Sequence, residues 1–198
     1  MNLAELTAEV YTITGRSDRT AETLTAIKAA TLKAHQSDFY YKDIFETGVA
    51  FDTSDYTQSL DYRTLIPLWR AVKYLRKYDI TTTPYTPGRI LDLLVPENIM
   101  DRYQVQKTDI YYVAGSYLNI NSSTQEQVYL LGCYLNPDIT VDGYNSWIAQ
   151  DHPYAIIFDA AATVFKAIGK DEEAAAYRSL NAEQLSMLRA SNIVANGF

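Results

Sequence analysis

Apolar residues recur at helical spacing near the end of the chain and predict two long helices there. The first is expected in PYAIIFDAAATVFKAIG, capped by Asp151 and ended by Gly169, and the second over 171–192. The expected apolar face of the first helix consists of Tyr154, Ile157, Phe158, Ala161, Phe165 and Ile168. This pair, His152–Asn192, is predicted to be the scaffold on which the other segments pack.

A second helical pair is predicted at the N-terminus. Asn2 begins a capping box of the Asn-x-x-Glu type, which favours a helix over 2–14. The next helix is expected over 20–35, with Ser17 or Asp18 of the GRSDR turn as its cap. Together these two helices predict an αα-hairpin.

Between the helical pairs, aromatic and β-branched residues predict a β-rich middle. Strands are expected in 39–51, 56–62, 68–80 and 109–135. The stretch 68–80 also fits a helix, but its flanks favour a strand, and 109–135 is expected to form a hairpin or a three-stranded meander. A short helix is predicted over 96–103, and a loop carrying Trp147 over 141–149.

The order of helices, strands and helices predicts an α+β fold rather than a parallel α/β sheet. A single compact unit requires the N-terminal pair to pack on the C-terminal pair. We therefore expect one domain over 1–198: a helical bundle built from both helix pairs, 1–38 and 143–198, with an insertion over 39–142 that is mainly β and forms an antiparallel β region.

Charge and composition narrow the classes of function. A net charge of −7 argues against a protein that grips nucleic-acid phosphates, but not against DNA passing nearby. The single cysteine, Cys133, excludes an intrachain disulfide, and with only His35 and His152 a multi-histidine zinc site is not expected. We expect no signal peptide and no membrane span. The 17 tyrosines suit either a β-rich middle or an interface.

Candidate catalytic and metal-binding residues are few, and each has a plainer explanation. Cys133, His152 and a nearby Asp suggest a nucleophilic triad, but Cys133 lies in the apolar strand pattern VYLLGCYL, where cysteine is usually a small buried residue. Asp138 and Asp142 suggest calcium, yet their spacing favours a turn. Four further acidic residues show no paired-carboxylate arrangement: Glu22, Asp38, Asp43 and Glu46. We expect no catalytic residue, cofactor or metal.

Basic residues cluster once along the chain. The cluster consists of Arg63, Arg70, Lys73, Arg76 and Lys77, interleaved with Trp69, Tyr74 and Tyr78. Such a mixture suits single-stranded nucleic acid or a sugar phosphate. It also suits a patch that meets an acidic neighbour in an assembly, and the net negative charge of the chain favours this second interpretation.

Five stretches together resemble the head-to-tail adaptor (connector) proteins of tailed bacteriophages, and they cover most of the chain. They are VYTITGRSDRTAETLTAIKAATLKAH, FYYKDIFETGVAF, LWRAVKYLRKYD, DIYYVAGSYLNI and SWIAQDHPYAIIFDAAATVFKAIGKDEEAAAYRSL. The resemblance implies a virion protein without catalytic activity. It would form a homo-oligomeric ring, a dodecamer, between the portal protein and the next tail or nozzle component. Double-stranded DNA would pass through the ring without specific binding, and no membrane would be involved.

The resemblance further implies synthesis in the host bacterial cytoplasm and a final place at the head–tail junction of the virion. The segment 189–198 is expected to be mobile in the free subunit and to order against the portal. The residues expected at that contact are Arg189, Ile193, Val194 and Phe198. One face of the C-terminal helical pair is expected to pack on the adjacent subunit.

Other functions stay open at the level of sequence. A neighbouring ring of the phage neck, a stopper or a tail terminator, belongs to the same class. A Tyr-rich module that binds carbohydrate or peptide belongs to another class, and a small hydrolase with a site around Cys133 or the Asp residues belongs to a third.

Overall fold

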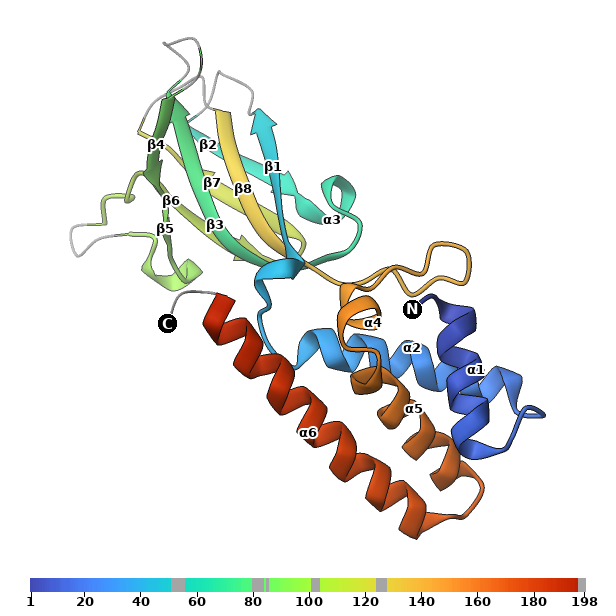
Figure 1. Ribbon diagram of the computed structural model, residues 1–198. Coiled ribbons are helices and arrows are strands. Elements are labelled where there is room, and N and C mark those ends of the chain that lie inside the picture. The colour runs from blue at the N-terminus through green and yellow to red at the C-terminus, as the bar shows by residue number, and fades with distance from the viewer. Residues whose placement is uncertain (51–55, 80–83, 85, 101–103, 124–127, 196–198) are drawn as a thin grey trace. The chain divides into compact units, whose positions relative to one another are not determined.

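A computed structural model describes residues 1–50, 56–79, 84, 86–100, 104–123 and 128–195 (Figure 1). The chain forms two compact units, a helical unit of Met1–Asp43 with Asn136–Phe198 and a β unit of Ile44–Leu135. The α+β class predicted from the sequence is confirmed. The β unit is shorter than the expected insertion over 39–142, because the residues on both sides of it pack with the helices.

The helical unit is organised around one central helix. Its elements are α1 (Leu3–Thr14), α2 (Thr20–Gln36), the 3-10 turn η1 (Tyr41–Asp43), α4 (Trp147–Asp151), α5 (Tyr154–Ala167) and α6 (Asp171–Ala195). Helices α1, α2 and α6 all pack against α5 (Figure 1). Buried alanines on α5, Ala160, Ala161 and Ala162, leave room for this close approach. The predicted C-terminal helical pair is confirmed.

The apolar face expected for α5 is too narrow. Ile156, Ala160 and Val164 lie outside the predicted stripe and are nevertheless buried, because neighbouring helices cover α5 on more than one side. Tyr154, which was predicted to lie on the stripe, is 48% exposed. Its ring lies beside the Phe158 ring, with the two ring centroids 5.3 Å apart.

The predicted capping box at the N-terminus is confirmed. The Glu5 amide donates to Asn2 Oδ1, and the Asn2 amide donates to Glu5 Oε2, both at 2.9 Å. Gly15 then closes α1 with φ 65°, a conformation that favours glycine. The two hydrogen bonds between Asn2 and Glu5 satisfy backbone amides that the start of a helix otherwise leaves without partners.

The predicted N-caps of α2 and α5 are wrong, whereas Gly169 follows the end of α5 with φ 78°, as predicted. Arg19 occupies the N-cap of α2 without a side-chain bond, because the Asp18 carboxylate pairs with Arg16 instead. Asp151 ends α4 rather than capping α5, and its carboxylate lies 2.6 Å from Lys42 Nζ. The expected loop over 141–149 contains the start of α4, which Ser146 caps.

The β unit consists of two four-stranded sheets. Its elements are β1 (Ile44–Ala50), β2 (Thr57–Asp61), α3 (Tyr62–Leu65), β3 (Trp69–Asp79), β4 (Thr86–Ile90), β5 (Asp92–Leu93), the 3-10 turn η2 (Pro96–Asn98), β6 (Ile110–Ala114), β7 (Tyr117–Asn121) and β8 (Val128–Leu135). The strand orders are β1-β8-β3-β4 and β2-β7-β6-β5. Only β5 and β6 pair in parallel among the described strands. Residues from both sheets form one core, including Leu75, Leu131, Leu118 and Ile120.

Several strand predictions are confirmed and one is wrong. The stretch 68–80 forms β3, and β6 and β7 form the expected hairpin. A three-stranded meander is wrong, because β8 pairs between β1 and β3 in the other sheet. The helix expected over 96–103 is reduced to the turn η2, and residues 101–103 lie outside the described part of the chain.

A glycine lets one tyrosine lie across the sheet β1-β8-β3-β4. Glu46, Gly132 and Tyr74 face one another on β1, β8 and β3. The Tyr74 hydroxyl donates to Glu46 Oε1 across β8. A Cβ atom added at Gly132 would lie only 2.6 Å from the Tyr74 ring. Burial, and then the Glu46 carboxylate, raise the pKa of Tyr74 to about 12.

We predict that Gly132→Ala destabilises the β unit by about 1–3 kcal/mol, because the Tyr74 ring must leave its position. Gly48→Ala is the matched control, since nothing lies within 4 Å of a Cβ atom built there. Urea unfolding of both variants measures the difference. Adding Tyr74→Ala to Gly132→Ala should cost less than the sum of the single changes. Equal stability of Gly132→Ala and Gly48→Ala would contradict the steric explanation.

Candidate functional site

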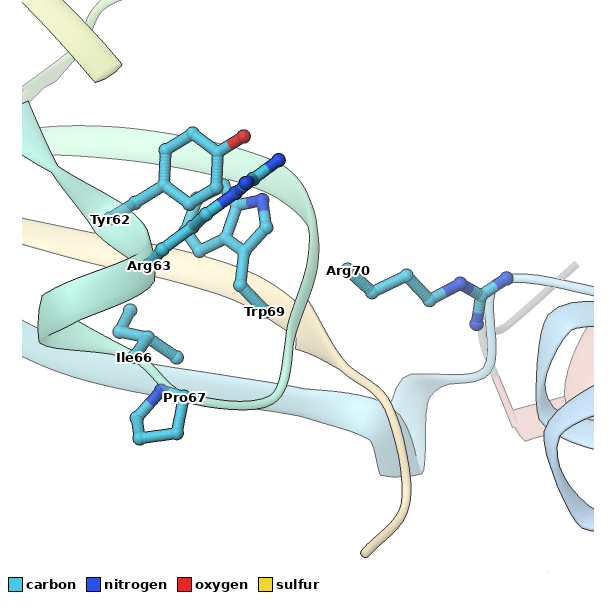
Figure 2. A pocket seen from close by; sticks show the side chains of 6 residues that line it. All are labelled: Tyr62, Arg63, Ile66, Pro67, Trp69 and Arg70. Carbon is cyan, nitrogen blue, oxygen red and sulfur yellow. The ribbon is translucent and has the colours of Figure 1, made fainter. Parts of the chain in front are cut away.

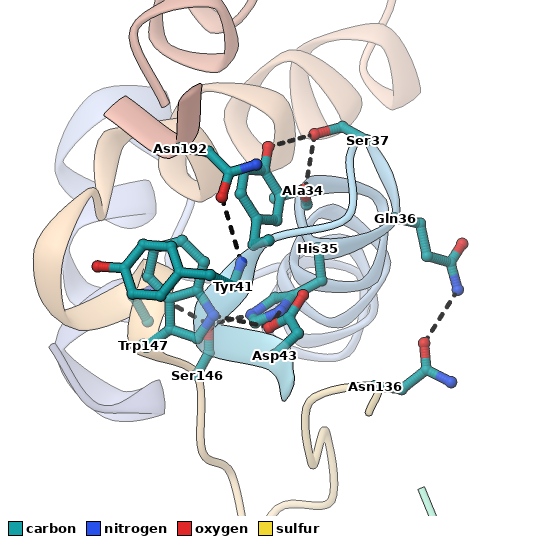
Figure 3. Close-up of polar contacts among 12 residues, drawn as sticks. Ala34, His35, Gln36, Ser37, Tyr41, Asp43, Asn136, Ser146, Trp147 and Asn192 are labelled. Carbon is teal, nitrogen blue, oxygen red and sulfur yellow. Dashed lines mark hydrogen bonds and ion pairs between the residues drawn. The ribbon is translucent and has the colours of Figure 1, made fainter. Parts of the chain in front are cut away.

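The C-terminal end of α6 is anchored to the segment that follows α2. Asn192 is buried, and its side chain accepts from the Tyr41 amide at 3.2 Å and donates to Phe39 O and Asp38 Oδ2, both at 3.3 Å. One turn earlier, Arg189 Nη2 donates to Ser37 O at 3.1 Å. Figure 3 shows the amide of Asn192 directed at the Tyr41 backbone. The end of α6 therefore has a defined position on this segment.

Large apolar side chains surround this anchor and face solvent. Phe39 is 51% exposed, Tyr41 41% and Ile193 53%. We call these three residues the α6-end patch. Hydrogen bonds from the intervening Asn192 hold the backbone of both contributing segments, so the patch is pre-organised. Exposed apolar groups on a rigid support suit a protein contact better than they suit a free surface.

Of the four residues predicted at the portal contact, Ile193 belongs to this patch. Arg189 lies one helical turn before Ile193, and its guanidinium donates a hydrogen bond to Ser37 O. The expectation of a mobile segment from Arg189 onward is wrong for 189–195, because α6 continues to Ala195 and is anchored there. The Val194 side chain and Phe198 lie outside the described part of the chain. The contribution of Phe39 and Tyr41 was not predicted, because it depends on a contact between distant segments.

Three buried residues of the helical unit have the order of a Ser-His-Asp triad. His35 Nδ1 lies 2.8 Å from Asp43 Oδ1, and His35 Nε2 lies 2.9 Å from Ser146 Oγ (Figure 3). A carboxylate only accepts, so in the neutral ring Nδ1–H donates to Asp43 and Nε2 accepts from the Ser146 hydroxyl. This group was not predicted from the sequence, because Ser146 stands 111 positions from His35 and the two belong to no recognisable motif.

The contacts around this trio are those of a structural network. Ser146 Oγ accepts from the Ala149 amide at 3.2 Å as the cap of α4, and Trp147 Nε1 donates to Asp43 Oδ1 at 2.7 Å. His35, Asp43 and Ser146 are each less than 10% exposed. A hollow of about 260 Å³ reaches Ser146, but its other lining residues supply no cationic side chain beside the hydroxyl. The trio joins the end of α2, η1 and the start of α4.

The catalytic and calcium candidates from the sequence do not form sites. Cys133 belongs to the β unit and His152 to the helical unit. The Cys133 thiol is buried, and burial raises its pKa to about 11, which disfavours the reactive thiolate. Asp138 Oδ1 accepts from the Thr140 amide and hydroxyl, both at 2.8 Å, and these bonds lower the pKa of Asp138. Asp138 therefore stabilises a turn.

The other acidic candidates each have a separate partner. Glu22 pairs with Arg19, Asp38 accepts from Asn192, and Glu46 accepts from Tyr74. In the part of the chain that the structure describes, no three His, Cys, Asp or Glu residues gather as metal ligands. Within the same residues, no helix has the length and apolar character needed to cross a bilayer.

The predicted basic cluster is dispersed over several surfaces. Lys77 faces the second sheet and lies 3.8 Å from Asp109. Lys73 lies over the Tyr134 ring. Arg63 lies beside the stacked rings of Tyr62 and Trp69, whose centroids are 4.4 Å apart, while Arg70 extends away from them (Figure 2). The hollow in Figure 2 measures about 380 Å³ and is lined by Tyr62, Arg63, Ile66, Pro67, Trp69 and Arg70.

We predict that Asp43→Ala lowers the free energy of unfolding by about 2–5 kcal/mol, because it leaves the His35 and Trp147 N–H groups buried without their acceptor. Asp142→Ala removes an exposed carboxylate from the same unit and should change stability by less than about 0.5 kcal/mol. Denaturant unfolding followed by tryptophan fluorescence measures both. Similar stabilities for the two variants would show that the network contributes little.

Comparison with known proteins assigns no family to the chain. No protein-family model matches it, and no curated protein matches it either.

Proposed function

We propose that the protein is a head-to-tail adaptor, a structural virion subunit that forms a ring between the portal and the next tail component around the DNA channel. The observation that carries this proposal is the α6-end patch. It presents Phe39, Tyr41 and Ile193 to solvent on an anchored backbone. The resemblance to adaptor proteins implies a portal contact at the same end of the chain.

Exposed apolar side chains elsewhere support a subunit of an assembly. They occur in both units and include Phe45, Tyr56, Leu93, Val95, Met100 and Met187, each more than 40% exposed. Single exposed apolar residues are ordinary, but a ring subunit needs two different lateral surfaces in addition to its faces toward the portal and the tail. Such a distribution over both units suits a protein with several partners.

The charge distribution supports a channel that does not hold DNA. The helical unit contains fourteen Asp and Glu residues but nine Lys and Arg residues, and the β unit contains ten against eight. A wall of net negative charge repels phosphates, so DNA can move past it. A neighbouring neck ring, a stopper or a tail terminator, meets the same physical requirement.

A carbohydrate- or peptide-binding module is the second candidate. The stacked pair Tyr62 and Trp69 beside the Arg63 guanidinium favours it, since aromatic faces and a cation suit a sugar or a carboxylate (Figure 2). Substituting Trp69 by Ala would abolish glycan or peptide binding in that case and leave portal binding intact in the other.

Ile193→Asp is expected to weaken binding to the portal protein by at least about tenfold, because it places a charge in the α6-end patch. Phe39→Asp should act in the same direction from the other segment of the patch. Ser191→Asp adds the same charge at an exposed polar position of α6 and is the control. Pull-down and titration with purified portal rings measure the three affinities. Unchanged binding by Ile193→Asp and Phe39→Asp would exclude this patch as the portal contact.

Deletion of Ala195–Phe198 is expected to weaken assembly onto the portal while leaving the circular dichroism of the free subunit unchanged, because the anchor at Asn192 is retained. Analytical ultracentrifugation of the truncated and full chains with portal rings makes the comparison. Full assembly of the truncated chain would count against a contact by these last residues.

A further inference from the structure

One face of the sheet β1-β8-β3-β4 has no covering element within the described residues of the β unit. Its other face carries Leu75 and Leu131 into the core shared with the second sheet. In Figure 1 this sheet lies in front of β2, β6 and β7, and its near side is uncovered. The cross-strand pairs place ten apolar or aromatic residues on that side: Ile44, Ala50, Ala71, Tyr74, Tyr78, Pro87, Ile90, Val128, Leu130 and Tyr134. We call this surface the open sheet face.

Arg76 is the cation at the centre of the open sheet face. It lies in one row with Gly48, Leu130 and Ile90 across the four strands. Its Nε atom is buried and has no hydrogen-bond partner. The nearest acidic residue on this face, Glu46, already accepts from Tyr74. The chain itself buries Nε, so a covering partner could reach only the outer nitrogens of the Arg76 guanidinium, where an anionic group would compensate the charge.

A second uncovered surface lies on α6. The buried side of this helix carries Ala174, Asn181, Leu188 and Asn192 at intervals of seven, seven and four residues. The opposite side carries Ala176, Ser179, Leu180, Glu183, Met187 and Ala190, all exposed. We call these six residues the outer stripe. Leu180 is 39% exposed and Met187 63%, and Glu183 is the one charged member of the stripe.

The outer stripe and the open sheet face are complementary in length, shape and charge. From Ala176 to Ala190 the outer stripe extends about 21 Å, and the eight residues of β8 extend about 26 Å, so a helix lying along the strands fits. Small residues on the stripe and Gly48 on the sheet allow close approach, whereas Gly132 is covered by the Tyr74 ring. The single anion of the stripe has the opposite charge to Arg76, at the middle of the open sheet face.

We propose that the open sheet face of one copy of this chain receives the outer stripe of α6 from a second copy, with the Glu183 carboxylate bound to the Arg76 guanidinium. Because the two surfaces differ, this contact is head-to-tail and repeats from copy to copy. It rests on the ring of the proposed function and identifies the lateral interface of that ring. It does not involve the α6-end patch, which stays available to the portal.

A second copy fits the open sheet face better than a nucleic acid does. Apolar and aromatic side chains cover most of the face, and only Lys73 and Arg76 supply positive charge, whereas binding to a phosphate backbone needs several cations in a track. The helical unit that carries the outer stripe has an excess of five acidic residues. The chain therefore contains both halves of a complementary contact.

Disulfide trapping between two full-length variants tests this arrangement. Arg76→Cys and Glu183→Cys are purified separately, mixed in equal amounts and oxidised mildly; the natural Cys133 is buried and its thiol pKa is raised, so it stays inert. The expected product is a covalent dimer that contains one chain of each variant. The control pairs Glu183→Cys with Lys107→Cys, an exchange outside the open sheet face. Equal dimer yields in both mixtures would overturn the proposal.

Charge reversal supplies an independent measurement. Arg76→Glu and Glu183→Arg should each weaken self-association by at least about tenfold in sedimentation experiments, and the double variant should recover it, with circular dichroism confirming that all three fold. The proposed interface would be overturned if the double variant failed to recover self-association. It would also be overturned if the wild-type chain stayed monomeric both alone and on portal rings. Portal binding is measured separately with the Ile193→Asp variant. A chain that self-associates but does not bind the portal would therefore refute the adaptor function and not this contact.

Discussion

The hydrogen bonds around Asp43 hold the place where the β unit leaves and rejoins the helical unit. Asp43 is the last residue before β1, and Ser146 and Trp147 follow soon after β8. One carboxylate oxygen accepts from both His35 and Trp147, while His35 also reaches Ser146. These bonds add to the packing of α1 and α2 on α5, and together they link the two parts of the helical unit across an insertion of 92 residues.

The same segment also positions the end of α6. Residues 37–41, which lead from α2 into the first residue of η1, supply the backbone groups that Asn192 and Arg189 bind. The side of this segment that contacts α6 also presents Phe39 and Tyr41 to solvent. A short connection between two elements therefore performs two tasks, since it anchors a long helix and builds the α6-end patch. Substitutions that loosen the connection would disturb the patch even when they touch none of its side chains.

Local signals predicted most of the helices and the main strands. The spacing of Leu6 and Val10 and the Asn2–Glu5 box specified α1 without help from the rest of the fold, because each interaction joins residues three or four apart. The pairing of β8 with β1 could not be predicted, since it joins residues 78 to 90 positions apart and the apolar pattern of β8 suits any central strand. The trio of His35, Asp43 and Ser146 was missed for the same reason. Ile193 was predicted as part of the C-terminal segment, whereas its neighbours in the patch, Phe39 and Tyr41, could be identified only from the fold.

The open sheet face and the outer stripe both expose apolar residues that do not contribute to the core of a single subunit. An isolated domain gains nothing from a four-stranded sheet with Tyr74, Tyr134 and Leu130 on the side away from its core, and such a face promotes aggregation. Likewise, α6 has exposed Leu180 and Met187 opposite its packed side. Selection for solubility alone would replace these residues with charged ones, as the first turn of α6 already shows with Asp171, Glu172 and Glu173. The proposed repeating assembly accounts for both surfaces, since each would cover the other.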